Sequence, residues 1–336
     1  MPKTIVAFFE TTAKEKKYLK KKFDKNFELL FYPDVLNASN AELIANVNII
    51  SPFIYSVVDS GVLNKAKKLK LIATRSTGFN HIDTKKAQEK NVSVANVPYY
   101  GENTVAEHTF ALILALSRNL HKAYVRTIRN DFALQGLQGF DLKGKTLGVI
   151  GAGSIGVHVI KIAKGFGMKV ITHDPKPNHI LTELLDFQYV TLEELLKNAD
   201  IITMHCPYNT HTHNLINMSN INLVKKGALF INTARSGVIE SKALYYAIDK
   251  NIFGGAGLDV FEGEDLVNEE NQMLTKNVSV EHLEALMKKN LLLRNENVIL
   301  TPHMAFDSVE AVERIMDTTV ENIKSFLDGK SYQKVI

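Results

Sequence analysis

Three short stretches in the second half of the chain carry the side chains with the clearest chemical use. They supply Arg235 from NTARSG, Glu264 from LDVFEGED and His303 from LTPHMAF. An arginine can grip both oxygens of a carboxylate, and a histidine can give a proton to a keto oxygen near neutral pH. A carboxylate beside a histidine keeps it protonated. Together these side chains suit hydride transfer between a nicotinamide and a 2-keto acid.

Each of these residues also has an ordinary structural explanation. A single arginine is usually a surface or ion-pair residue, a histidine after Thr-Pro is often a capping residue, and Glu264 stands in an acidic loop that water could solvate. Asp259 is a further candidate in the same stretch as Glu264. The three stretches follow successive predicted strands, where ligands of open α/β sheets bind, and this position favours the catalytic interpretation.

A glycine-rich loop lies upstream of these stretches. GVIGAGSIG (148–156) places Gly151, Gly153 and Gly156 in the pattern G-x-G-x-x-G. The first glycine permits a tight turn, the second lets the backbone approach a pyrophosphate, and the third allows a helix to pack closely on a strand. Backbone N–H groups at the start of the next helix, those of Ser154 and Ile155 among them, would face the phosphates. The pattern predicts a dinucleotide site.

Asp174 ends the next predicted strand, about 20 positions after Gly153. A carboxylate there hydrogen-bonds the ribose 2′-OH of NAD and would repel the 2′-phosphate of NADP. The alternative is that Asp174 caps the turn before Pro175. Because the spacing and the strand–loop–helix context both fit the dinucleotide motif, we predict that NAD is the cofactor.

The composition indicates a globular protein of two domains, with 336 residues, 45% of them hydrophobic and 23% charged. The single cysteine, Cys206, excludes an internal disulfide and a multi-cysteine metal site, and no metal is expected. The net charge of +4 is too small to indicate nucleic acid, and the lysines of 13–23 fit a solvated helix face. The first residues predict neither a signal peptide nor a membrane span, so we expect a cytoplasmic protein.

Strands and helices alternate twice along the chain, from KTIVAFF to VSVANVP and again from KTLGVI to NVILTPH. The alternation predicts an α/β fold with two doubly wound parallel sheets. The segment between them, 101–130, reads as one long apolar helix; polar residues such as Glu107 and His108 interrupt it, which favours a buried helix bridging two domains over a membrane span. For the last helix, 308–328, Asp307 could cap the start and Gly329 the end.

The order and spacing of these motifs resemble the NAD-dependent D-2-hydroxyacid dehydrogenase family, and most of all its D-lactate dehydrogenase branch. The resemblance covers nearly the whole chain. It rests on TRSTGFNHID (74–83), VPYYGENTVAEHT (97–109), GAGSIG with Asp174, HCP (205–207), INTARSG, GLDVFEGE and TPHMAF.

The resemblance implies a role for each matching residue. Arg235 would bind the substrate carboxylate, and Glu264 would assist His303, the acid–base residue. The backbone N–H groups of Thr77 and Gly78 would also bind the carboxylate. Tyr100 and Phe306 would wall the substrate site. Besides the glycine loop and Asp174, cofactor contacts are implied for Cys206, Pro207, Thr212, Thr233 and Asp259.

The resemblance also implies the domain organisation. A flavodoxin-like substrate domain would comprise residues 1–100 and 301–336, and a Rossmann NAD-binding domain, 101–300, would be inserted in it. Hinges would fall near residues 101 and 300, and closure would shed water from the hydride path. In relatives the helix at 103–120 forms a homodimer, which would account for its apolar character.

Several departures from the family pattern leave the substrate open. Ser236 stands where relatives commonly have glycine, Asp307 stands where many have an aromatic residue, and the segment 265–296 is longer than in many members. The leading hypothesis is a D-lactate dehydrogenase that reduces pyruvate with NADH. The alternatives are a dehydrogenase for a branched or aromatic D-2-hydroxyacid and, in a different class, an NAD(H)-sensing scaffold or corepressor.

Overall fold

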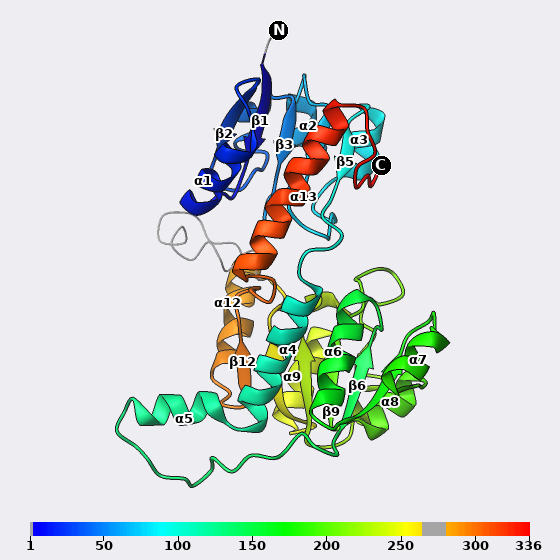
Figure 1. Ribbon diagram of the computed structural model, residues 1–336. Coiled ribbons are helices and arrows are strands. Elements are labelled where there is room, and N and C mark those ends of the chain that lie inside the picture. The colour runs from blue at the N-terminus through cyan, green and yellow to red at the C-terminus, as the bar shows by residue number, and fades with distance from the viewer. Residues whose placement is uncertain (1–2, 264–279) are drawn as a thin grey trace. The chain divides into compact units, whose positions relative to one another are not determined.

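The computed structural model of the chain describes residues 3–263 and 280–336. The chain divides into two compact units (Figure 1). The first unit runs to Gly101 and resumes with Ser308–Ile336, and the second is Glu102–Asp307. The second unit is therefore an insertion in the first.

The first unit contains a five-stranded parallel sheet in the order β2-β1-β3-β4-β5. Its strands are β1 (Thr4–Phe8), β2 (Phe27–Phe31), β3 (Ile49–Ser51), β4 (Leu71–Ala73) and β5 (Ser93–Ala95). Its helices are α1 (Ala13–Lys22), the 3-10 helix η1 (Ala41–Ile44), α2 (Ser60–Lys65), α3 (Thr84–Glu89) and α13 (Val309–Leu327).

Helices cover both faces of this sheet because its strands carry apolar side chains on both sides. One core joins α2 and α3 to the strands through residues such as Leu63, Ala87 and Ile72. The other joins α1 and α13 through residues such as Leu19 and Ile323. The last helix of the chain therefore completes the core of the unit that the first residues begin.

The ends of α13 differ in part from the sequence-based prediction. The N-cap is Ser308, whose Oγ accepts a hydrogen bond from the Ala311 amide at 3.1 Å, so the prediction of Asp307 as the cap was wrong by one position. The hydroxyl of Ser308 reaches the third amide of the helix as serine caps commonly do. Gly329 follows the helix with a φ of 67°, the left-handed conformation for which glycine is suited.

The second unit contains a seven-stranded parallel sheet in the order β12-β11-β10-β9-β6-β7-β8. Its strands are β6 (Thr146–Ile150), β7 (Lys169–His173), β8 (Gln188–Tyr189), β9 (Ile201–Met204), β10 (Ala228–Asn232), β11 (Phe253–Leu258) and β12 (Val298–Leu300). Its helices are α4 (Glu102–Ser117), α5 (Leu120–Thr127), α6 (Ser154–Gly165), α7 (His179–Leu185), α8 (Leu192–Asn198), η2 (Ile221–Leu223), η3 (Ser236–Val238), α9 (Ser241–Asp249) and α12 (Val280–Leu293).

The predicted fold class, two doubly wound α/β sheets, is confirmed. In the second unit α4 and α6 pack on one face of the sheet, and α8 and α9 pack on the other (Figure 1). The central strands β9 and β10 are buried along their whole length, as expected of strands covered on both faces.

The long apolar helix predicted for 101–130 is two helices. Asn119 adopts a left-handed φ of 50°, which ends α4 and redirects the chain into α5. Residues such as Phe110, Ile113 and Leu116 bury α4 within the second unit, so packing inside this unit accounts for its apolar character. The homodimer through this region stays a prediction. No described helix is long and apolar enough to cross a membrane.

Candidate active site

The candidate residues of the second unit lie in loops at the carboxyl ends of the strands of its sheet. Loop 151–153 follows β6, Asp174 follows β7, His205 follows β9, Thr233 follows β10 and Asp259 follows β11. Because all these strands are parallel, their carboxyl ends point the same way. This edge is where ligands bind in sheets of this kind.

One position of the glycine loop has free space where a side chain would lie. Gly151 has a φ of 98°, and a Cβ on it would lie 2.8 Å from backbone atoms of His205 and Cys206. A Cβ on Gly156 would lie 2.0 Å from the Gly151 carbonyl oxygen. A Cβ on Gly153 would meet no protein atom within 4 Å. Because the fold does not require a glycine at position 153, the space beside it fits a ligand that approaches the backbone closely.

The start of α6 suits a phosphate in that space. Gly153 is the N-cap of this 12-residue helix and has no side chain to bond its first amides. The N–H groups at such a helix start, with those of Ser154 and Ile155 among them, attract anions. The residues present therefore fit the pyrophosphate of a dinucleotide.

Asp174 lies against the glycine loop. Its Oδ2 accepts a hydrogen bond from the Ala152 amide at 2.9 Å, and its Oδ1 accepts one from the Lys176 amide at 2.8 Å. The second bond is the turn cap that was the alternative interpretation of this residue. The first bond places the carboxylate beside the loop, as the ribose-binding interpretation requires.

The HCP segment after β9 carries no ionised side chain at neutral pH. Desolvation by burial lowers the pKa of His205 to about 3, and its Nε2 lies 2.8 Å from Thr203 Oγ1. Burial raises the pKa of the Cys206 thiol to about 11, so the thiol stays protonated and weakly nucleophilic. Neither residue is suited to proton transfer or to covalent chemistry at neutral pH.

Pro207 and Thr212 belong to the turn that follows. Thr212 Oγ1 donates to the Pro207 carbonyl at 2.5 Å and accepts from the Asn209 amide at 2.8 Å. The Thr212 side chain therefore closes the turn, and the two predicted cofactor contacts lie next to each other.

The Arg235 loop is shaped by the last residue of β10. Asn232 Oδ1 accepts from the Ala234 amide at 3.0 Å, and Asn232 Nδ2 donates to the Arg235 carbonyl at 2.9 Å. Arg235 Nη1 donates to the Ala234 carbonyl at 2.7 Å, which is its single protein acceptor within 3–263 and 280–336. The remaining N–H groups of this half-buried guanidinium are available to a carboxylate.

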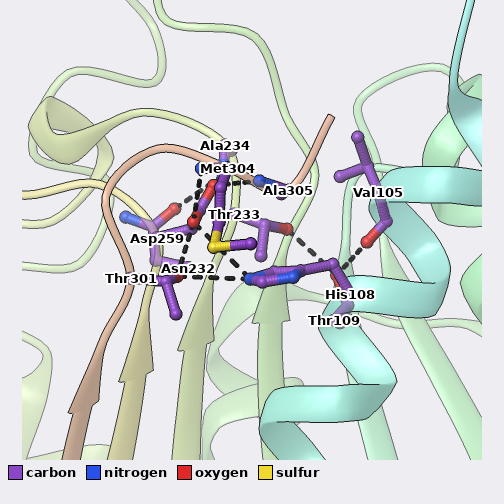
Figure 2. A network of polar contacts seen from close by, with 10 residues as sticks. All are labelled: Val105, His108, Thr109, Asn232, Thr233, Ala234, Asp259, Thr301, Met304 and Ala305. Carbon is purple, nitrogen blue, oxygen red and sulfur yellow. Dashed lines mark hydrogen bonds and ion pairs between the residues drawn. The ribbon is translucent and has the colours of Figure 1, made fainter. Parts of the chain in front are cut away.

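Asp259 organises the loop that carries His303 (Figure 2). Its side chain is 1% exposed. Oδ1 accepts from Thr301 Oγ1 at 2.5 Å and from the Met304 amide at 3.0 Å, and Oδ2 accepts from the Ala305 amide at 2.8 Å. The Asp259 carbonyl accepts from the His303 amide at 3.0 Å. One buried carboxylate thus binds the loop at Thr301, before His303, and at Met304 and Ala305, after it.

These contacts keep Asp259 ionised despite its burial. Desolvation acts to raise the pKa of Asp259, but the hydrogen bonds from His108, Thr301 and the backbone amides outweigh it and lower the pKa below its usual value. The backbone of His303 has a φ of 51°, a left-handed conformation that costs free energy for a residue with a Cβ. The bonds to Asp259 compensate for that cost.

Two residues of α4 join this site that were not among the predicted site residues. His108 Nε2 lies 3.2 Å from Thr301 Oγ1 and 3.5 Å from Asp259 Oδ1. Thr109 Oγ1 lies 3.0 Å from Thr233 Oγ1, at the start of the Arg235 loop. The signal in the sequence was the presence of polar residues in an apolar helix; His108 counted there only as evidence against a membrane span, and Thr109 was not singled out.

Three of the predicted substrate contacts lie in the first unit. Thr77 Oγ1 donates to the Val97 carbonyl at 2.8 Å, and the Thr77 carbonyl accepts from Asn96 Nδ2 at 2.8 Å. In the described part of the chain, neither the Thr77 nor the Gly78 amide donates to another protein group, as a carboxylate-binding role requires. The carbonyl of Tyr100 accepts from Arg314 Nε. Their contact with the substrate stays a prediction.

The remaining two predictions concern Glu264 and Phe306. Glu264 lies outside the described residues. Phe306 follows the Asp259-bound loop in the second unit and is half-buried, and its contact with substrate also stays a prediction.

Comparison with known proteins places this architecture in a family. A model of the D-isomer specific 2-hydroxyacid dehydrogenase NAD-binding domain matches residues 110–305. D-lactate dehydrogenase of Escherichia coli is 35% identical over 332 residues, which is 97% of this chain and 98% of that protein. The aromatic 2-oxoacid reductase of Clostridium sporogenes is 37% identical over 300 residues, 88% of this chain and 87% of that protein.

A solved structure agrees along nearly the whole chain. The crystal structure of D-lactate dehydrogenase from Aquifex aeolicus, complexed with NAD and lactic acid, superposes with a TM-score of 0.87 at 35% identity and covers 96% of each chain. The predicted family and the predicted cofactor, NAD, are confirmed. The chain is a member of the NAD-dependent D-isomer specific 2-hydroxyacid dehydrogenase family and is an oxidoreductase.

Proposed function

We propose that the protein interconverts pyruvate and D-lactate with NADH and NAD. This proposal rests mainly on one observation. The ends of β10 and β11, together with α4, hold both the Arg235 loop and the His303 loop. An arginine for the carboxylate and a histidine for the keto oxygen are the two side chains that reduction of a 2-keto acid needs. The D-lactate dehydrogenases of E. coli and A. aeolicus, each 35% identical to this chain, support pyruvate as the first candidate.

The side chains would divide the work as follows. Arg235 binds the substrate carboxylate with two N–H groups and thereby orients the keto carbon. When bound, NADH would supply the hydride for that carbon, and His303 would supply the proton for the keto oxygen. In the reverse direction His303 accepts the hydroxyl proton of D-lactate. Glu264 is proposed to hold the His303 imidazole in its protonated form.

The cofactor contacts are proposed on the geometry of the loops. The amides after Gly153 would bind the pyrophosphate, and Asp174 would bind the adenosine ribose. Cys206 and Pro207 would line the adenine side, and Asp259 would lie near the nicotinamide. Thr212 and Thr233 would be further cofactor contacts. The amides of Thr77 and Gly78 would bind the substrate carboxylate together with Arg235, and Tyr100 and Phe306 would limit the size of the substrate.

A larger 2-keto acid is the alternative substrate. The relative at 37% identity is an aromatic 2-oxoacid reductase, and Asp307 stands in this chain where many relatives have an aromatic residue. A sensor that binds NADH without turnover is the alternative of another class.

The first experiment is NADH oxidation by the purified protein with pyruvate, followed by chiral analysis of the product. We expect turnover and D-lactate. Binding of NADH without oxidation would exclude pyruvate, and branched and aromatic 2-keto acids would then be assayed. If none of these is reduced while NADH still binds, the sensor replaces the enzyme as the proposal.

In Asp174→Ala, the ratio of the Kd for NADPH to the Kd for NADH is expected to fall about tenfold or more. The variant removes a charged hydrogen bond to the ribose together with the repulsion of a 2′-phosphate. The chain has no tryptophan, so the fluorescence of NADH or NADPH itself reports binding. Asp174→Asn is the matched control, because it removes the charge but can still accept the hydrogen bond from the Ala152 amide. An unchanged ratio of the two dissociation constants in both variants would mean that Asp174 serves only as a cap.

A further inference from the structure

We propose that His108 is a positioning residue for hydride transfer, which holds the 301–305 loop and with it His303. The proposal rests on the acid–base function proposed for His303. His108 comes from α4, 193 positions before Thr301, and is not adjacent in sequence to any residue of that loop. Figure 2 shows its imidazole directed at Thr301 and Asp259.

The hydrogen-bond directions fix which imidazole nitrogen carries a proton. Thr301 Oγ1 donates its one hydrogen to Asp259 Oδ1 at 2.5 Å. The same Oγ1 must therefore accept from His108 Nε2, 3.2 Å away, and Asp259 Oδ1, at 3.5 Å from Nε2, can only attract a donor. Nε2–H is thus required whether the ring is neutral or charged. His108 can be replaced in this role only by another hydrogen-bond donor that reaches these two acceptors.

Loss of the hydrogen bond from His108 should change the position of the 301–305 loop. Asp259 is 1% exposed and the His108 side chain 17%, so water does not readily replace a lost hydrogen bond to the carboxylate. Thr301 begins the loop, and the Met304 and Ala305 amides that bind the same carboxylate lie beyond His303. A displaced Asp259 side chain would loosen the loop on both sides of a residue with a strained backbone.

The neighbouring residue of α4 supports the same view of this helix. Thr109 bonds Thr233 at 3.0 Å and also donates to the Val105 carbonyl within α4 at 2.9 Å. Consecutive residues of one buried helix therefore contact the two loops that carry Arg235 and His303. The distance between the carboxylate-binding group and the acid–base group is set in part by α4.

The test compares His108→Phe, which keeps a ring of similar size but has no donor, with His108→Gln, whose amide N–H can reach the same acceptors. We expect His108→Phe to lower kcat about 10- to 100-fold, the size expected of a small misplacement of a catalytic group, with the Kd of NADH changed less than about threefold. We expect His108→Gln to restore most of kcat. The matched control is His121→Phe, which removes a half-buried histidine bonded to the Ala115 and Glu296 carbonyls and should keep the kcat of the wild type.

Hydrogen–deuterium exchange gives a second measurement that needs no turnover. The Met304 and Ala305 amides should exchange about tenfold faster in His108→Phe than in the wild type, and near the wild-type rate in His108→Gln and His121→Phe. Wild-type exchange in the Phe variant, or equal losses in the Phe and Gln variants, would overturn the proposal. If the wild type reduces no 2-keto acid, the proposed function fails, and the exchange rates still decide whether His108 holds the loop.

Discussion

Replacement of His303 by alanine is expected to lower kcat by about 10²- to 10⁴-fold while NADH binds nearly as in the wild type. The reason is that neither His205 nor His108, which lie in the elements around this site, can take over the proton. His205 stays neutral because burial lowers its pKa to about 3, and the Nε2–H of His108 is committed to Thr301 and Asp259.

The backbone of His303 calls for a second variant in this experiment. Alanine is strained at a φ of 51°, whereas asparagine adopts left-handed conformations more readily. His303→Asn therefore keeps the loop but not the acid–base group, and it should lose as much kcat as His303→Ala. The measurement is steady-state oxidation of NADH with pyruvate. Turnover by His303→Asn at the wild-type rate would assign the effect to backbone strain and remove His303 from the chemistry.

The second large effect is expected at Arg235. Arg235→Lys should raise the KM for pyruvate about 10- to 100-fold, because an ammonium cannot grip both carboxylate oxygens as a planar guanidinium does. NADH binding should change little, since Arg235 makes no described contact with the glycine loop. Arg235→Gln, which has no charge, should raise the KM further and lower kcat as well.

The turn around Arg235 provides the control for that experiment. Asn232 bonds the Ala234 amide and the Arg235 carbonyl, so the backbone of the turn does not depend on the Arg235 side chain. The Lys and Gln variants should therefore unfold at nearly the temperature of the wild type. A wild-type KM in Arg235→Lys would mean that other groups hold the carboxylate, for which the amides of Thr77 and Gly78 are the first candidates.

Much of the fold was predictable because its signals are local. Apolar strands, the glycine loop and the alternation of strands with helices are each contained in about 30 residues or fewer, and they predicted both sheets and the nucleotide edge. The break between α4 and α5 was missed because an apolar run does not reveal a single left-handed residue such as Asn119. The cap of α13 was misplaced by one residue because Asp307 and Ser308 are both good caps.

The site was predictable in its parts but not in its connections. Arg235, Asp259 and His303 could be proposed because each follows a strand in a recognisable stretch. The contact of His108 with Thr301 joins residues 193 positions apart, and no local pattern encodes such a pair. Likewise, Asp259 was predicted as a cofactor contact, whereas the structure adds that its carboxylate accepts from the Thr301 hydroxyl before His303 and from the Met304 and Ala305 amides after it.

The place of α13 has a consequence for how the chain is made. Synthesis on the ribosome releases the strands of the first unit before the inserted unit, whereas Met316, Val320 and Ile323, which help to cover that sheet, emerge only after it. The inserted unit, Glu102–Asp307, is continuous in sequence and can fold before them. Until α13 is made, α1 covers that face of the sheet only in part, so apolar surface stays exposed while the inserted unit is synthesised. A chain that ends before α13 would keep this apolar surface exposed. We expect chaperones to bind such a chain and proteases to degrade it.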